Sequence, residues 1–150
     1  MGRGGRALNT VRMAEDFIKR SERFLKEASL ALSEDDYATC VRRSQECVEM
    51  SLKAVLRLLA IEYPLKHDVS EVILKLDHYP LPDWFKEHLP YLAETSRVLA
   101  KLRGPAMYGS EDELRPASDL FTKADAESAY KDAEKVFRLC SRIIDSWLRK

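Results

Sequence analysis

The chain has 150 residues, of which 45% are hydrophobic and 33% are charged, with 25 basic and 25 acidic side chains. This length predicts one domain whose core is large enough to fold alone. The balanced charge excludes a protein that coats nucleic acid with a wholly basic surface, but it permits a local basic patch. No apolar run approaches the roughly 20 residues of a membrane span, and no signal peptide is recognisable, so we expect a cytoplasmic protein without membrane contact.

The cysteines and histidines give no sign of a metal centre. Cys40, Cys47 and Cys140 fall on apolar helix faces, and an odd number of cysteines is typical of buried free thiols in a reducing compartment. Neither they nor the three histidines have the spacing of metal ligands, and no glycine-rich phosphate loop is present. We therefore expect neither a metal nor a cofactor.

The N-terminal part predicts an irregular arm followed by a long helix. Residues 1–9 are rich in glycine and arginine, which favours a disordered N-terminal arm ahead of a single helical domain over residues 10–150. From about Thr10 to Leu32 apolar residues recur three and four positions apart, and charged residues occupy the other half of the helical wheel. This segment is the first predicted helix.

Residues 36–60 predict the central helix. Apolar and small side chains cover most of its circumference, more than a helix with one packed face requires, so we expect two packed sides. The second neighbour is either another helix or a second subunit. Ser44 and Gln45 fall on the apolar arc, where an interhelical hydrogen bond is expected to satisfy them. Ser33 followed by Asp36 predicts the N-terminal cap and a short turn between antiparallel helices.

Two further long helices complete the pattern. After Pro64 the periodicity breaks, and a short helix is expected to start at Ser70. Pro82 predicts the start of a third long helix, which kinks or splits at Pro90 and ends at Gly104-Pro105.

An irregular linker over residues 104–121 separates this helix from the last one. Thr122 and Asp125 predict a capping box, after which the last helix continues to the C-terminus. The linker is long for a helical bundle, and such connections are often functional. The predicted fold is all-α, an antiparallel bundle of four long helices plus one short helix.

Several segments together resemble the HEPN domain family. RRSQECVEMSLKAVL (42–56) resembles the family's second helix, R-S-x-x-x-x-E-x-x-L-K-A, and it is followed by His67-Asp68. AEDFIKRSERFLKEASLALSEDDY (14–37) and FTKADAESAYKDAEKVFRLC (121–140) resemble its opening and closing helices. The resemblance implies a HEPN-like helical domain that forms a homodimer. Prokaryotic members are commonly the partner of a minimal nucleotidyltransferase in a toxin–antitoxin pair.

The end of the third long helix resembles the site of the family's R-x(4–6)-H signature. Members with that signature are metal-independent ribonucleases, in which the histidine takes the ribose 2′-OH proton and the arginine stabilises the phosphorane. Here Tyr108 stands at the fifth position after Arg103, Gly104 replaces a polar residue, and no histidine follows. A phenol with a pKa of about 10 is a poor base at neutral pH.

The candidate ligand-binding residues are Arg103, Tyr108 and Arg115, and the first two are also the catalytic candidates. A guanidinium holds phosphate and tyrosine stacks on a base, with the resemblance placing their junction near the dimer cleft. The alternative is that Arg103 pairs with an acid of the linker, Glu111 or Asp112. We interpret His67 as a loop histidine that packs or caps.

Three functional hypotheses remain open. The first is a HEPN-domain protein that binds nucleotide or RNA and pairs with a minimal nucleotidyltransferase. The second is a metal-independent ribonuclease toxin that uses Arg103 with Tyr108 or another base, so enzymatic activity is undecided. The third is a non-catalytic dimeric scaffold.

Overall fold

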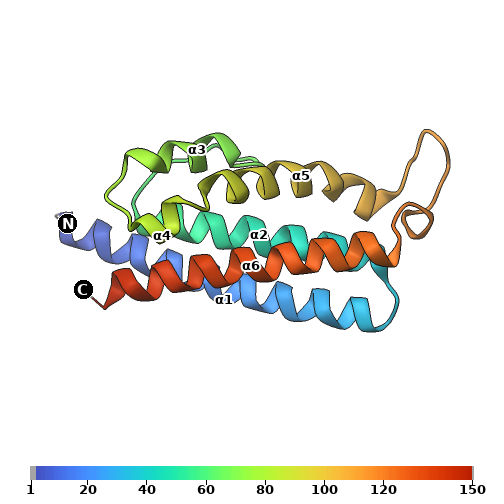
Figure 1. Ribbon diagram of the computed structural model, residues 1–150, viewed down its shortest axis with the longest axis horizontal. Helices are drawn as coiled ribbons and strands as arrows, with labels where there is room; N and C mark the ends of the chain where they lie inside the picture. Colours follow the sequence, from blue (N-terminus) through green and yellow to red (C-terminus); the bar gives the residue numbers. More distant parts are fainter. Residues whose placement is uncertain (1–2, 150) are drawn as a thin grey trace.

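The computed structural model describes residues 3–149, and every regular element in that range is helical (Figure 1). The four long helices are α1 (Arg3–Ser33), α2 (Tyr37–Leu58), α5 (Leu89–Tyr108) and α6 (Lys123–Leu148). Two short α-helices and two 3-10 turns lie between them: α3 (Ser70–Leu74), η1 (Lys75–His78), α4 (Asp83–Lys86) and η2 (Ala117–Asp119). The predicted all-α bundle with four long helices is confirmed. Helix α3 is the predicted short helix, and α4 is the segment that the predicted split at Pro90 separates from the third long helix.

Helix α2 lies at the centre of the bundle. It packs against α1, α5 and α6, and more than half of its residues are buried. The two-sided packing predicted for it is therefore supplied by helices of the same chain, without a second subunit. Its side chains form one core with those of the other helices, for which Leu52, Phe85 and Ile143 are representative.

The three cysteines are free and buried in this core, as predicted. Burial raises the pKa of Cys40 to about 11 and that of Cys47 to about 12, and it raises that of Cys140 further still. These thiols are consequently protonated at neutral pH and serve as packing groups rather than as nucleophiles.

The start of α2 differs from the prediction, whereas that of α6 agrees with it. The cap of α2 is Asp36, whose carboxylate accepts a hydrogen bond from the backbone N–H of Thr39 at 3.3 Å. Ser33 is instead the last residue of α1, because that helix continues through it, and its hydroxyl donates to the carbonyl of Leu30. The capping box of Thr122 and Asp125 at the start of α6 is confirmed.

Helix α1 starts at Arg3, earlier than the predicted Thr10. Residues 7–9 are exposed, and backbone hydrogen bonds extend the helix here, each added residue contributing one bond to an existing helix. Residues 3–9 thus form a helical extension, where the composition favoured an irregular arm. The rest of that arm, residues 1–2, lies outside the described residues.

The third long helix splits at Pro90 as predicted, since Pro90 occupies the first turn of α5. The predicted end at Gly104-Pro105 is wrong, because α5 continues to Tyr108. Pro105 therefore lies inside the helix, where it removes one backbone hydrogen bond without ending α5. Gly109, with φ 70°, ends the helix, and this leaves a shorter connection than the predicted linker.

The position of Gly109 permits a direct test of this helix end. A Cβ added there would lie 2.2 Å from the carbonyl oxygen of Arg115, whereas one added at Gly104 would meet nothing within 4 Å. We expect Gly109→Ala to lower the free energy of unfolding by about 1–3 kcal/mol, because it combines a left-handed φ with a clash. The control Gly104→Ala should raise it by about 0.5–1 kcal/mol, since alanine is the better helix former. Urea unfolding measures both changes, and equal effects would contradict this account.

Candidate functional site

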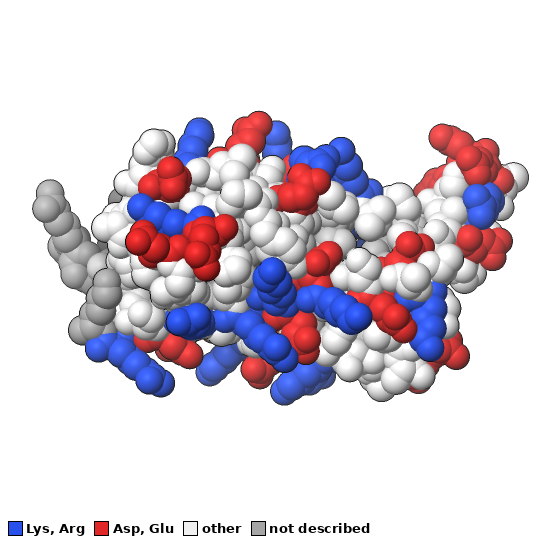
Figure 2. Space-filling model, viewed as in Figure 1, with Lys and Arg blue, Asp and Glu red and all other residues white. Residues whose placement is uncertain are grey.

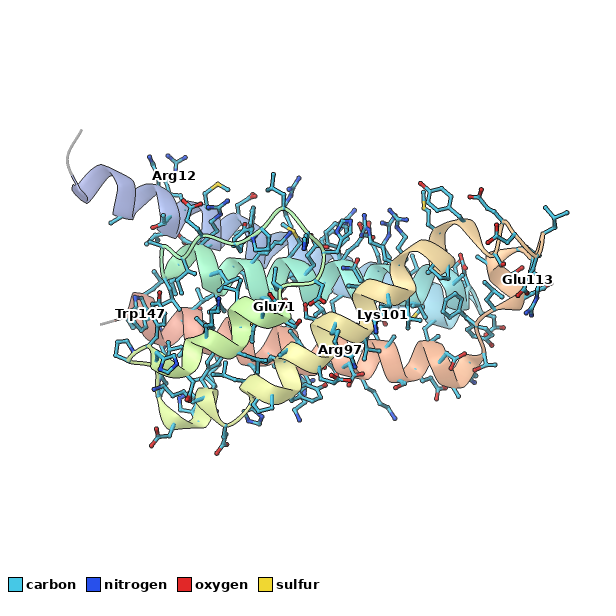
Figure 3. All side chains as sticks on the ribbon, turned by 90° about the horizontal axis from the view of Figure 1, so that it is seen from above. Arg12, Glu71, Arg97, Lys101, Glu113 and Trp147 are labelled. Atoms are coloured by element: carbon cyan, nitrogen blue, oxygen red, sulfur yellow. The ribbon has the colours of Figure 1, made fainter. Side chains whose placement is uncertain are left out.

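One cavity brings together residues from four separate segments of the chain. It has a volume of about 170 Å³ and lies between α1, α2, α5 and residues 61–69, a segment here called the strap. Seen from above, the strap runs along the same side of the molecule as Arg12 of α1, and α6 lies along the opposite side (Figure 3). We call this cavity the Arg103 pocket, and its lining consists of Arg20, Phe24, Glu46, Glu49, Met50, His67 and Arg103.

Arg103 faces α2 from the last turns of α5. Its Nη1 donates a hydrogen bond of 2.8 Å to Oε1 of Gln45, and it lies 3.9 Å from Oε2 of Glu46. The interhelical hydrogen bond predicted for Gln45 is therefore confirmed. The Ser44 hydroxyl is buried and forms no interhelical hydrogen bond among the described residues, contrary to the same expectation.

The partners expected for Arg103 in the linker do not contact it. Glu111 and Asp112 lie beyond the end of α5, and the arginine turns inward to α2 instead. Its side chain is 23% exposed, so the guanidinium is fixed by α2 and still open to the pocket.

Glu49 is the centre of a polar network on the same side of α2. Its carboxylate accepts hydrogen bonds from Gln45 Nε2 at 3.0 Å and from Lys53 Nζ at 2.8 Å. His67 Nδ1 lies 2.8 Å from Oε1 of the same carboxylate. Burial opposes ionisation of Glu49, but the hydrogen bonds from Lys53, Gln45 and His67 and the charge of Lys53 outweigh it, so its pKa is lowered. Gln45 links this network to Arg103.

The contact with Glu49 orients the imidazole of His67. A carboxylate can only accept, so Nδ1 of His67 carries the proton in this contact and Nε2 is left able to accept one. The imidazole is 53% exposed, compared with 13% for the Glu49 side chain. His67 therefore has the hydrogen-bonding pattern of a general base held by a carboxylate.

Several contacts hold the strap, which carries His67, against α2 and α5. The ring of Tyr63 lies against the cations of Lys53 and Arg57, at 5.3 and 4.6 Å from its centroid. At the far end, the N–H of Val69 donates to Ser96 Oγ at 3.0 Å. These contacts fix the imidazole relative to α2 and α5.

Sequence reasoning missed His67 as a site residue. It precedes Arg103 by several helical segments, whereas the family signature would place a histidine shortly after the arginine. Its contact with Glu49 depends on how the strap crosses α2, which no spacing in the sequence reveals. The only available signal was the His67-Asp68 pair, which we interpreted as structural.

The other two candidate residues lie elsewhere. Tyr108 points about 140° away from Arg103 around α5, because five residues separate them on the same helix. It is 66% exposed and lines a separate cavity of about 390 Å³ beneath the loop that follows α5. The side chain of Arg115 interacts within the same loop. Its Nη2 donates a hydrogen bond of 3.1 Å to the carbonyl of Asp119, and its Nη1 forms an ion pair of 3.7 Å with the carboxylate of Glu113. The structure thus does not bring the three candidates together.

Within residues 3–149, no set of three or more histidine, cysteine, aspartate or glutamate side chains is placed to hold a metal ion. No helix in this range is both long and apolar enough to span a membrane.

The lowered pKa of Glu49 predicts how acid affects stability. A carboxyl group whose pKa is lower in the folded state stabilises the fold above its unfolded pKa, and this contribution is lost as the pH falls through the folded value. We therefore expect the urea midpoint to fall less between pH 7 and pH 3 for Glu49→Gln than for the wild type. Glu71→Gln, at an exposed position of α3, is the matched control. If the urea midpoints of the wild type and Glu49→Gln fell equally between pH 7 and pH 3, the result would contradict the hydrogen-bond network around Glu49.

Comparison with known proteins assigns the chain to a family. Residues 14–143 match the HEPN domain model. "Putative toxin MJ1304" of Methanocaldococcus jannaschii is 34% identical over 134 residues, which is 86% of each chain. TT1696 of Thermus thermophilus shares the fold, with a TM-score of 0.68 and 22% identity over 86% of this chain and 96% of that one. ST0689, an archaeal HEPN homologue, has a TM-score of 0.64 and 25% identity over 87% of this chain and 97% of its own. The chain belongs to the HEPN domain family.

Proposed function

We propose that this protein is a cytoplasmic HEPN toxin-like protein that binds the phosphate of a nucleotide or RNA in the Arg103 pocket. We propose further that it is the partner of a minimal nucleotidyltransferase in a toxin–antitoxin pair. The observation that carries the ligand assignment is that two guanidinium groups able to donate hydrogen bonds to a phosphate, those of Arg103 and Arg20, line one cavity together with the imidazole of His67. The toxin name of the similar M. jannaschii protein supports the toxin-like assignment.

The environment of Arg103 suits an exchangeable anion. Gln45 holds one guanidinium nitrogen in a short hydrogen bond, and Glu46 is a loose partner at 3.9 Å. A phosphate can therefore replace Glu46 without disturbing the bond that orients the arginine, and its two oxygens match the guanidinium fork. Phe24 in the pocket wall offers an aromatic face for a base, although Arg43 lies 5.9 Å from its centroid.

Substitution of Arg103 tests phosphate binding. We expect uridine 3′-monophosphate or a short RNA to bind the wild type, and Arg103→Ala to weaken this binding about 10- to 100-fold, the value of one or two charged hydrogen bonds. Isothermal titration calorimetry measures the dissociation constants. Arg97→Ala is the matched control, because Arg97 lies on the same helix and pairs with Glu94.

The two remaining outcomes both count against the proposal. Equal binding by Arg103→Ala would show that the ligand is held elsewhere. If no ligand bound the wild type or raised its melting temperature, the non-catalytic scaffold would be the better description, since a ligand that binds only the folded state stabilises it.

A second function, metal-independent ribonuclease, is favoured by the position of His67 in the same pocket as Arg103. In this reaction Nε2 of His67 takes the proton of a ribose 2′-OH, and the 2′ oxygen attacks the adjacent phosphorus. The bond to the 5′ oxygen breaks, water protonates that oxygen, and a 2′,3′-cyclic phosphate and a 5′-hydroxyl result. Arg103 stabilises the charge on the phosphorane, and Glu49 holds the imidazole and the imidazolium that forms.

The histidine variants test this second function in the presence of EDTA. If the wild type cleaves mixed RNA, His67→Ala should lower the rate about 10²- to 10⁴-fold, the usual contribution of a general base. Arg103→Ala should lower it as well, while His78→Ala and Tyr108→Phe should retain it. Full activity in His67→Ala, or products without a cyclic phosphate, would exclude this mechanism.

We also propose that the protein forms a homodimer across the face that contains the Arg103 pocket. Met13 lies two turns before Arg20 on α1, and Met107 lies one turn after Arg103 on α5, so both share that face. They are 42% and 49% exposed, which leaves large apolar side chains around a polar pocket.

A further inference from the structure

The loop after α5 forms a defined projection, here called the arm (residues 109–116), beyond one end of the bundle (Figure 1). Ser110 and Arg115 exchange two backbone hydrogen bonds of 2.9 Å, and these close the arm at its base. Gly109 packs so closely on the Arg115 carbonyl that a side chain would not fit. The arm is therefore held in one conformation although it makes little contact with the core.

The tip of the arm combines three acidic side chains with one large apolar side chain. Glu111, Asp112 and Glu113 are exposed, and Figure 2 shows acidic side chains gathered on this projection. Within residues 3–149 only Glu113 of the three forms an ion pair, with Arg115 of the same arm. Leu114 is 89% exposed and has a φ of 54°, which is unfavourable for a leucine. A leucine held exposed in this conformation, after three acidic residues and before Arg115, has the character of a docking group.

A complementary surface lies toward the opposite end of the molecule. Leu65 of the strap is 96% exposed, the highest value among the exposed large apolar residues, and Lys66 follows it. Arg12 of α1 lies on the same side as the strap, and Met13 follows it in the sequence. Neither Arg12 nor Lys66 forms an ion pair within the described residues. We call Arg12, Met13, Leu65 and Lys66 the basic end. It offers two cations and two apolar side chains to a partner with the opposite charge.

A two-fold axis is the symmetry that would pair these two surfaces. Figure 3 shows Arg12 and Glu113 at opposite ends of the bundle, and the Arg103 pocket lies on the face between α1, the strap and α5. A two-fold axis within that face and perpendicular to the bundle turns each arm toward the basic end of the other copy. Such an arrangement is self-complementary and closes with two copies.

We propose that the arm of each copy docks on the basic end of a second copy, with Leu114 against Leu65 and the carboxylates of the arm facing Arg12 and Lys66. This rests on the homodimer proposed above and names the contact that forms it. Charge complementarity favours a second copy over a nucleic acid or an anionic membrane, because both carry the same sign of charge as the arm. The docked arm contacts the strap next to His67, so dimerisation adds to the intrachain contacts that hold the histidine of the Arg103 pocket.

Charge reversal at both surfaces tests the contact by sedimentation equilibrium. The arm variant is Glu111→Lys with Asp112→Lys, and the basic-end variant is Arg12→Glu with Lys66→Glu. Each alone should raise the dimer dissociation constant at least about tenfold, and their combination in one chain should restore it. The control is Glu127→Lys with Lys131→Glu on α6, which reverses charges away from this face and should leave the constant unchanged.

Three outcomes would overturn the contact: a monomeric wild type, single variants that dimerise as the wild type does, or a combined variant as weak as either single variant. None of them depends on a nucleotide, so they are distinguishable from failure of phosphate binding, which Arg103→Ala tests. As a second readout, Leu114→Asp should weaken the dimer and raise the amide hydrogen-exchange rate of residues 65–68. Unchanged exchange in a dissociated Leu114→Asp variant would show that the arm does not fix the strap.

Discussion

The partly buried carboxylate of Glu49 is the group on which the site depends. A charged group in such a position destabilises the fold unless several donors satisfy it, and here Lys53, Gln45 and His67 do so. Each donor ties a different part of the chain to α2. His67 brings the strap, and Gln45 extends the network to Arg103 of α5. The requirement to satisfy one carboxylate therefore places a guanidinium and an imidazole at one pocket.

The helices could be predicted from the sequence because interactions between residues that are close in the sequence determine where each helix forms. The apolar arc of α2, the start of α3 at Ser70, the split at Pro90 and the capping box at Thr122 all follow from residues a few positions apart. The errors lie where local signals compete. Gly104-Pro105 resembles a helix end, yet α5 continues through Pro105 and ends at the left-handed Gly109.

The site was harder to predict because it depends on contacts between distant segments. Arg103 was identified from its place in the chain, and Gln45 from its position on an apolar arc. Their mutual hydrogen bond could not be inferred, because it depends on the rotation of α5 against α2. Tyr108 has the spacing of the family signature but points to another side of the helix. His67 has no such spacing and reaches the pocket through the strap. In this family member the fold is shared with its relatives, while the chemistry has to be argued from the particular side chains.

The central claim is that Arg103 and His67 act on one ligand. Nuclear magnetic resonance of the imidazole nitrogens tests it directly, because the chain has only three histidines. We expect uridine 3′-monophosphate to shift the signals of His67 in a saturable manner, to leave His78 and His88 unchanged, and to have no effect on His67 in Arg103→Ala. Equal shifts at all three histidines, or a His67 response that persists without Arg103, would contradict a shared site.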